Sequence, residues 1–268
     1  MVFAMPETEL GHFPDVGASY FLSRLPGFFG EYVGLTGARL DGAEMLACGL
    51  ATHFVPSTRL TALEADLCRV GSSDPVTFSS TIINAYTQHP HLKQHSAYHR
   101  HVLDVIERCF SRRTVEEIIS TLVSSYNEWI SATIRALKKA SPASLKISLR
   151  SVSFSKCVTC SNGIELTSCI KFQIREGRFQ GVGECLIREY RMVCHVLKGE
   201  LSKDLVEVFS AFLIDYKDRK PKWEPQRLEQ VTDNMVDQYF KRMDEEEGWE
   251  DLKLPPRINL SSSIIAKL

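Results

Sequence analysis

Apolar residues recur every three or four positions along most of the chain, which is the spacing of an amphipathic helix. The same pattern is typical of a chain whose helices each bury one face. It predicts helices over 16–25, 29–36, 42–48, 59–70, 98–109, 115–123, 126–140, 144–150, 182–197, 200–214 and 231–243, with another beginning at Asp74-Pro75. Strand character is confined to two short segments, 2–5 and 52–55. The chain is therefore expected to be mainly helical with only short strand remnants.

Capping residues mark several of these helix ends. Gly37 and Gly49 follow two apolar segments and are expected to end them, because glycine adopts the left-handed conformation found after a helix. Asp41 is expected to cap the helix that begins at Gly42, and Thr114 with Glu117 forms the pattern of a capping box. The strand at 2–5 is expected to have nothing before it to pair with.

The segment 152–173 has a different texture, because it is rich in Ser, Thr and Cys and lacks a helical period. We expect an irregular insertion here, which divides the chain into a first part at 1–56, a helical region at 57–151, the insertion at 152–173 and a helical region at 174–268. Cys157, Cys160 and Cys169 invite a zinc interpretation, but no second ligand pair has the right spacing. The histidines between 89 and 101 favour a solvated surface. No metal site is predicted.

Composition excludes several classes of function. The formal net charge is −1, so the chain has no basic footprint for nucleic acid. No apolar run approaches the ~20 residues that a membrane span requires, and the first residues lack the pattern of a secretion signal. The eight cysteines follow no framework, which favours a reducing compartment.

Two carboxylates stand out near the start of the chain. Glu7 and Asp15 lie eight positions apart in a segment made mostly of Gly, Pro and apolar residues. Carboxylates in an apolar pocket can acquire different pKa values and take different roles in acid–base chemistry. A purely structural interpretation is also open, in which Glu7 caps a turn and Asp15 is the N-cap of the next helix.

The last three residues, Ala266, Lys267 and Leu268, form a close variant of the Ser-Lys-Leu peroxisomal address. The preceding Pro- and Ser-rich stretch is typical of a loose tail, which such an address needs. We therefore expect import into peroxisomes through the import receptor.

The order and spacing of several motifs resemble the crotonase superfamily, an α/β fold, and within it the plant-type peroxisomal 3-hydroxyisobutyryl-CoA hydrolases. The motifs are Met-Pro-Glu-Thr at 5–8, Gly-His-Phe-Pro-Asp-Val-Gly at 11–17, Leu-Thr-Gly at 35–37, Gly-Leu-Ala-Thr-His-Phe-Val at 49–55, Ser-Pro-Ala-Ser-Leu-Lys at 141–146, Glu-Tyr-Arg at 189–191 and Pro-Lys-Trp at 221–223.

The resemblance implies hydrolysis of the 3-hydroxyisobutyryl-CoA thioester, a step of valine breakdown, with Glu7 as the catalytic glutamate and Asp15 as the acid that binds the substrate 3-hydroxyl or orients the partner groups. Coenzyme A would be part of the substrate, so no separate cofactor is implied, and a homo-oligomer is an open expectation. Glu7 would activate water or attack the carbonyl directly.

Departures from the family pattern accompany the resemblance. The ββα spiral that supplies the family's oxyanion hole is expected before the Glu7 segment and is absent from this sequence, so the chain is expected to be a truncated form with impaired activity. His12 stands where the family usually has an apolar residue. Two alternatives stay open: a peroxisomal enoyl-CoA hydratase or isomerase, and a non-catalytic helical remnant that binds a full-length homologue.

Overall fold

Helix α2 (Phe29–Thr36) lies at the centre of the structure, and all of its residues are buried. Its bounds match the prediction from sequence. Gly37 follows it with φ +63°, in the left-handed conformation that ends a helix without steric cost for glycine. A side chain here would also press on Pro6, since an added Cβ would lie 3.1 Å from the Pro6 Cα. The end of α2 thus packs closely against the segment that leads to Glu7.

The computed structural model describes residues 1–70, 78–93, 96–124, 127–153, 180–211, 220–243 and 248–255. The helices and strands around α2 within these ranges are β1 (Val2–Phe3), η1 (Glu7–Leu10), α1 (Ala18–Phe21), η2 (Leu22–Arg24), β2 (Leu40–Asp41), α3 (Gly42–Ala47), η3 (Ser57–Arg59), α4 (Leu60–Arg69), η4 (Phe78–Ile83), α6 (Asn84–Tyr86), α7 (Arg100–Phe110), α8 (Val115–Val123), α9 (Glu128–Lys139), α10 (Pro142–Ser153), α12 (Val182–Lys198), α13 (Asp204–Phe209), η6 (Leu228–Gln230) and α14 (Asp233–Gln238).

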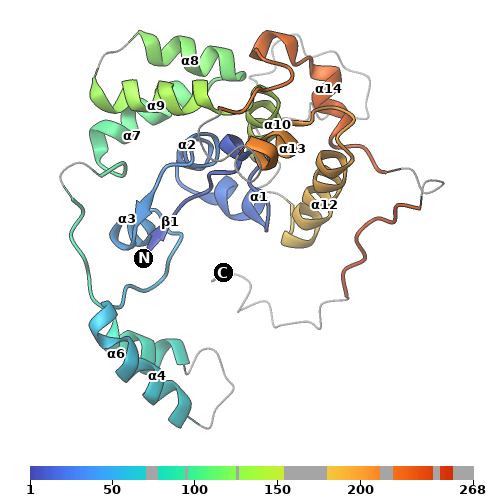
Figure 1. Ribbon diagram of the computed structural model, residues 1–268. Helices are drawn as coiled ribbons and strands as arrows, with labels where there is room; N and C mark the ends of the chain where they lie inside the picture. The colour runs from blue at the N-terminus through green and yellow to red at the C-terminus, as the bar shows by residue number, and fades with distance from the viewer. Residues whose placement is uncertain are drawn as a thin grey trace, which may run out of the picture.

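The main core is built by helices that surround α2. Helices α7, α9 and α10 pack directly on it, and α8 packs on α7 and α9. Phe29 of α2 is fully buried and meets the Tyr98 ring edge-on, with the ring centroids 5.1 Å apart. Aromatic contacts of this kind add to the burial of apolar area. Figure 1 shows α4 and α6 projecting from this body as a separate helical pair.

The strand predicted over 2–5 is present but shorter, and its partner comes later in the chain. Val2 and Phe3 form β1, which pairs antiparallel with β2 at Asp41 and Leu40. Strand β2 leads straight into α3, where Asp41 caps the helix as predicted and forms a capping box with Glu44. The mainly helical character, with only short strands, agrees with the prediction from sequence.

Several predicted elements differ from the structure. The helix predicted over 16–25 is the short α1 followed by the 3₁₀ helix η2, and the helix predicted over 144–150 extends over Pro142–Ser153 as α10. Residues 52–55 form no strand, because the Phe54 ring packs against Gly42 and the Phe54 carbonyl accepts a hydrogen bond from the Gln88 amide at 2.8 Å. The helix predicted to begin at 200 begins instead at Asp204, whose amide donates to the Ser202 hydroxyl. The last predicted helix ends at Gln238, five residues before the predicted end at 243.

Segments far apart in the sequence meet around η1 and α1. Helix α12 packs on α1, while α13, α10 and α2 contact η1. Figure 1 shows α12 beside α1 and close to α13, although about 170 residues separate the first two. The start of the chain is thus held between its centre and its C-terminal helices.

Several predictions fall on residues outside those that the structure describes. These are the helix start at Asp74-Pro75, the three cysteines at 157, 160 and 169, and the address at Ala266, Lys267 and Leu268. The division of the chain into four regions also stays a prediction. Over the described ranges, no helix is both long enough and apolar enough to cross a membrane.

Candidate active site

Helix η1 places Glu7 at its first position and is fixed from two sides through Thr8. The Thr8 side chain is fully buried, and its hydroxyl donates to the Leu35 carbonyl of α2 at 3.1 Å. The Thr8 carbonyl in turn accepts from the Ser141 amide, just before α10, at 2.9 Å. Because both neighbours belong to the core, Glu7 projects from a rigid support.

The turn after η1 is equally constrained. Gly11 has φ +69°, and an added Cβ would lie 2.4 Å from the carbonyl carbon of Asp204, so only glycine fits. Asp204 is 2% exposed, and its carboxylate accepts from the Ser141 hydroxyl at 2.5 Å and from the Glu224 amide at 2.8 Å. A buried and hydrogen-bonded aspartate therefore holds the backbone that carries Glu7 and His12.

Glu7 is the most strongly perturbed acid of this region. Burial raises its pKa from 4.5 to about 7, its own backbone N–H opposes the shift, and the charge of Asp15 raises the pKa further. The Glu7 Oε2 atom is buried and accepts no hydrogen bond from any part of the chain that the structure describes. Buried carboxylates are normally paired, so an unpaired one beside a second acid is typical of a functional site.

His12 lies between these two acids in the chain and contacts Asp15. Its Nε2 is 3.3 Å from an Asp15 carboxylate oxygen, and its ring packs against the Phe13 ring at 4.5 Å between centroids. Burial lowers the His12 pKa, and Asp15 partly opposes that shift. The ring is therefore neutral at pH 7. His12 is thus a third member of the candidate site that the sequence analysis placed at Glu7 and Asp15.

The structural interpretation of Asp15 is wrong. The N-cap of helix α1 is Gly17, not Asp15. Glycine has no side chain, so the cap residue itself cannot bond to the first amides of the helix. Instead Glu189 of α12 accepts hydrogen bonds from the Gly17 amide at 2.7 Å and from the Ser19 amide at 2.8 Å. Asp15 contributes only its backbone carbonyl, which accepts from the Ala18 amide, so its carboxylate stays available to His12.

Sequence reasoning missed Glu189 as part of this site, although a signal for it exists. Within α12, Cys185, Glu189 and Met192 occupy successive positions of one buried helix face. An acid in an otherwise apolar stripe is unusual, because a carboxylate is rarely buried without partners. That pattern could have marked Glu189 as a residue with a specific partner elsewhere in the chain.

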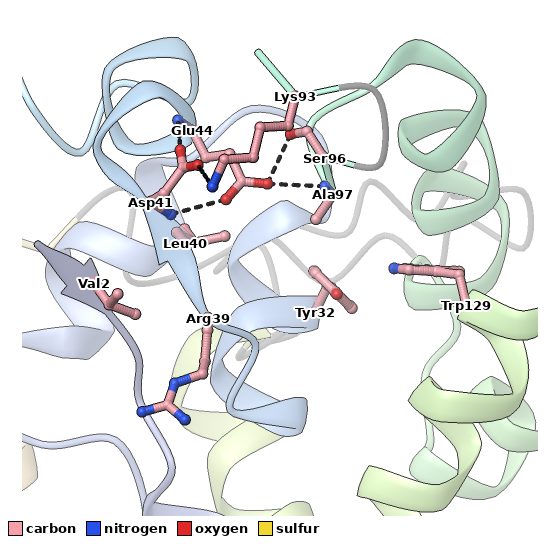
Figure 2. A pocket seen from close by; sticks show the side chains of 10 residues that line it. All are labelled: Val2, Tyr32, Arg39, Leu40, Asp41, Glu44, Lys93, Ser96, Ala97 and Trp129. Atoms are coloured by element: carbon pink, nitrogen blue, oxygen red, sulfur yellow. Dashed lines mark hydrogen bonds and ion pairs between the residues drawn. The ribbon is translucent and has the colours of Figure 1, made fainter.

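A separate cavity of about 490 Å³ lies beside β2, away from this acidic cluster. Its lining residues are Val2, Tyr32, Arg39, Leu40, Asp41, Glu44, Lys93, Ser96, Ala97 and Trp129. Figure 2 shows that its two carboxylates are already engaged: Glu44 accepts from the Asp41 amide, the Ser96 hydroxyl and the Ala97 amide, while Asp41 pairs with Lys93 at 2.9 Å. The acids of this cavity thus have structural roles, and Glu7 and Asp15 line none of it.

The acids and the histidine of the cluster are residue types that can bind metals, but their arrangement does not form a metal site among the described residues. In the ranges that the structure describes, no group of three or more His, Cys, Asp or Glu residues is arranged to hold a metal ion. The chemistry that the cluster itself can supply is proton transfer and hydrogen bonding, from one acid with a pKa of about 7, a second acid and a neutral imidazole.

Known proteins resemble the chain over nearly its whole length. The chain is 70% identical to two Arabidopsis thaliana proteins. One is named probable 3-hydroxyisobutyryl-CoA hydrolase 3 and matches 99% of this chain, and the other is named 3-hydroxyisobutyryl-CoA hydrolase 1 and matches 100% of it. The chain spans 64% of the length of each. Among solved structures, a carnitinyl-CoA dehydratase from Mycobacterium thermoresistibile superposes with a TM-score of 0.70 and 28% identity, covering 91% of this chain and 60% of that one.

These similarities agree with the α/β fold class and the resemblance seen in the sequence motifs. The family model described as enoyl-CoA hydratase/isomerase matches residues 1–240, which include the whole acidic cluster and the helix that carries Glu189. The chain belongs to the enoyl-CoA hydratase/isomerase family.

Proposed function

We propose that the cluster of Glu7, His12 and Asp15 hydrolyses an acyl-CoA thioester, with 3-hydroxyisobutyryl-CoA as the substrate. The observation that carries this proposal is the unpaired, buried Oε2 of Glu7 on a carboxyl whose pKa is raised to about 7. The names of the two Arabidopsis relatives support the choice of substrate.

Glu7 is suited to act as a base at neutral pH. With a pKa of about 7 it is ionised in about half of the molecules at that pH, and a base of this strength is matched to its operating pH. Glu7 takes a proton from water as the water oxygen bonds to the thioester carbonyl carbon. The C–S bond then breaks, and the proton passes to the coenzyme A sulfur. Direct attack by Glu7 would instead form an anhydride that water hydrolyses.

Asp15 is suited to recognise the 3-hydroxyl group of the acyl chain. Its carboxylate is partly exposed, caps no helix and, among the residues that the structure describes, contacts one side chain, His12, through one oxygen. A carboxylate in this state can accept a hydrogen bond from a substrate hydroxyl, and such a charge-assisted bond is stronger than one between neutral groups. The neutral His12 ring keeps Asp15 from turning away.

The test is release of coenzyme A thiol from 3-hydroxyisobutyryl-CoA, measured with the purified chain and a thiol reagent. We expect Glu7→Gln to lower the rate by about 100-fold or more, because it removes the base. Glu9→Gln is the matched control: Glu9 lies in the same short helix and pairs with Lys139 at the surface, so its loss should leave the rate within about twofold. The comparison is internal to the chain and holds at any absolute rate, including the low one expected from the sequence.

Three outcomes would contradict the proposal. If Glu7→Gln releases thiol as fast as the unchanged chain, Glu7 is not the base. If the chain instead removes the alkene absorbance of an enoyl-CoA without releasing thiol, it is a hydratase. An absence of both reactions, in a chain that stably binds a longer family member, would favour the non-catalytic alternative.

The place in valine breakdown and the peroxisomal location extend the same proposal. The final tripeptide, Ala266 to Leu268, supports import, since a small–basic–leucine terminus is read by the peroxisomal receptor. A fluorescent protein ending in the last twelve or so residues of the chain should enter peroxisomes, whereas the same fusion without Leu268 should stay outside. Import of both fusions, or of neither, would reject the terminal address.

A further inference from the structure

The backbone that carries Asp15 has a conformation poorly suited to its sequence. The Ala18 amide donates to the Asp15 carbonyl at 3.0 Å and closes a turn, with Val16 at φ +54° and Gly17 at φ +88° in its centre. Two positive φ angles are typical of a type I′ turn, which favours Asn, Asp or Gly at both central positions. Valine is β-branched and unfavourable there, and its side chain is 77% exposed, so its own packing does not hold the turn.

Glu189 holds this turn from the other end of the chain. It is 3% exposed, lies in α12, and accepts three hydrogen bonds: from the Gly17 amide at 2.7 Å, the Ser19 amide at 2.8 Å and the Ser19 hydroxyl at 2.6 Å. The first donor belongs to Gly17, directly after the unfavourable Val16, and the other two belong to Ser19, three positions after it. A strained backbone persists when its surroundings over-determine it, and these three bonds are such surroundings.

The arrangement also separates two tasks that one acid would otherwise share. An aspartate just before a helix usually caps the first free amides with its own carboxylate. Here the distant Glu189 takes those amides, and the Asp15 carboxylate turns to His12 instead. Burying a second carboxylate is a costly way to cap a helix, so capping alone is a poor reason for it.

We propose that Glu189 is a positioning residue, which aims the Asp15 carboxylate at the substrate by holding the turn through Gly17 and Ser19. This inference rests on the proposed thioester hydrolysis. Glu189 itself acts at a distance from the reacting atoms, and its effect passes through two backbone amides. Loss of this hold should therefore displace Asp15 and slow the chemical step, in addition to the stability lost when a buried amide is left unpaired.

The experiment compares Glu189→Gln with Ser19→Ala and Glu200→Gln in the whole chain. The glutamine has the same shape, but its NH₂ would face an N–H donor, so one of the two amide contacts is lost. Ser19→Ala removes only the hydroxyl bond, leaves both amides paired, and is the milder variant if the glutamine protein does not fold. Glu200→Gln makes the same charge change at an exposed position just beyond α12.

Two readouts separate positioning from structure. The first is thiol release, for which Glu189→Gln should lower kcat by about 10- to 100-fold with KM within about twofold, because a displacement of about 1 Å can cost that much. The second is the His12 ring titration followed by NMR and assigned with His12→Gln. Asp15 raises the His12 pKa, so a displaced Asp15 should let it fall further. Ser19→Ala should shift both readouts in the same direction but less, and Glu200→Gln should shift neither.

The outcomes also distinguish this inference from the proposed function. If the unchanged chain hydrolyses the thioester and Glu189→Gln keeps its kcat and its His12 titration, Glu189 is a structural cap and the inference is overturned. If the unchanged chain shows no hydrolysis, the proposed function fails, and the His12 titration alone decides: a lower His12 pKa in Glu189→Gln supports the positioning role, and an unchanged one rejects it. The same comparison with Ser19→Ala applies where the glutamine variant is unfolded.

Discussion

Replacing Glu7 with glutamine should make the folded chain more stable at neutral pH while it abolishes the proposed chemistry. In the unfolded chain the Glu7 carboxyl loses its proton near pH 4.5, whereas burial keeps it protonated to about pH 7 in the fold. Between these values the folded state holds one proton more than the unfolded state, so the free energy of unfolding falls as the pH rises. Glutamine has no charge to bury and escapes this loss.

The magnitude follows from the raised pKa. The shift from 4.5 to about 7 corresponds to about 3 kcal/mol at ~1.4 kcal/mol per unit, which is an upper bound. Glu7 is only partly buried, so solvent screening reduces the effect to about 1–2 kcal/mol. This is the amount by which the Glu7→Gln protein should gain stability, relative to the unchanged chain, between pH 5 and pH 8.

The assay is urea unfolding of both proteins at pH 5 and pH 8, with Glu9→Gln as a control for the loss of one negative charge. The prediction concerns the change between the two pH values, so a constant cost of placing an amide at this site does not affect it. A difference that stays the same at both pH values, or that moves against Glu7→Gln as the pH rises, would refute the reasoning that burial raises the pKa of Glu7.

Three further predictions concern the surroundings of the pair. Burial lowers the His12 pKa, so the contribution of His12 to stability should fall as the pH drops below 6.5, opposite in sign to that of Glu7; the stability of His12→Gln relative to the unchanged chain should therefore rise between pH 7.5 and pH 5.5 in urea unfolding, and an unchanged difference would contradict this. Val16→Gly should raise the free energy of unfolding by about 0.5–1 kcal/mol, because relief of the left-handed valine exceeds the entropy added to the unfolded chain; a loss of stability would argue against strain at this turn. Asp204→Asn should lower the free energy of unfolding by about 1–2 kcal/mol, since a neutral amide replaces the charge-assisted bonds that the carboxylate accepts from the Ser141 hydroxyl and the Glu224 amide; a Tm equal to that of the unchanged chain would show that these bonds do not hold the turn after η1.

The sequence predicts local features of this fold well where residues next to each other decide them. The bounds of α2 and the cap of Asp41 on α3 depend on neighbouring side chains and glycines, and both predictions match the structure. The Thr114 hydroxyl likewise accepts from the Glu117 amide at the predicted start of α8. Contacts between residues far apart in the sequence are harder to predict from the sequence alone. The segment around Phe54 has the residue types of a strand, but the Phe54 ring packs on Gly42. No pattern in the neighbouring residues predicts this contact.

The candidate site divides in the same way. Glu7 and Asp15 could be identified because two acids in an apolar segment are unusual whatever the fold. The roles of His12 and Glu189 could not, because they depend on a 3.3 Å contact with Asp15 and on hydrogen bonds that span about 170 residues. The capping role predicted for Asp15 failed for this reason: a distant carboxylate outcompetes the local one for the amides of α1.

The most direct test of the central claim is the pH dependence of coenzyme A release from 3-hydroxyisobutyryl-CoA. If Glu7 is the base, the rate should rise with pH through an apparent pKa of about 7, because only the ionised carboxylate accepts the proton. Glu7→Gln should remove this rise, and Glu9→Gln should preserve it. A rate that rises near pH 4.5, the ordinary pKa of a glutamate, or one that does not depend on Glu7, would contradict the account.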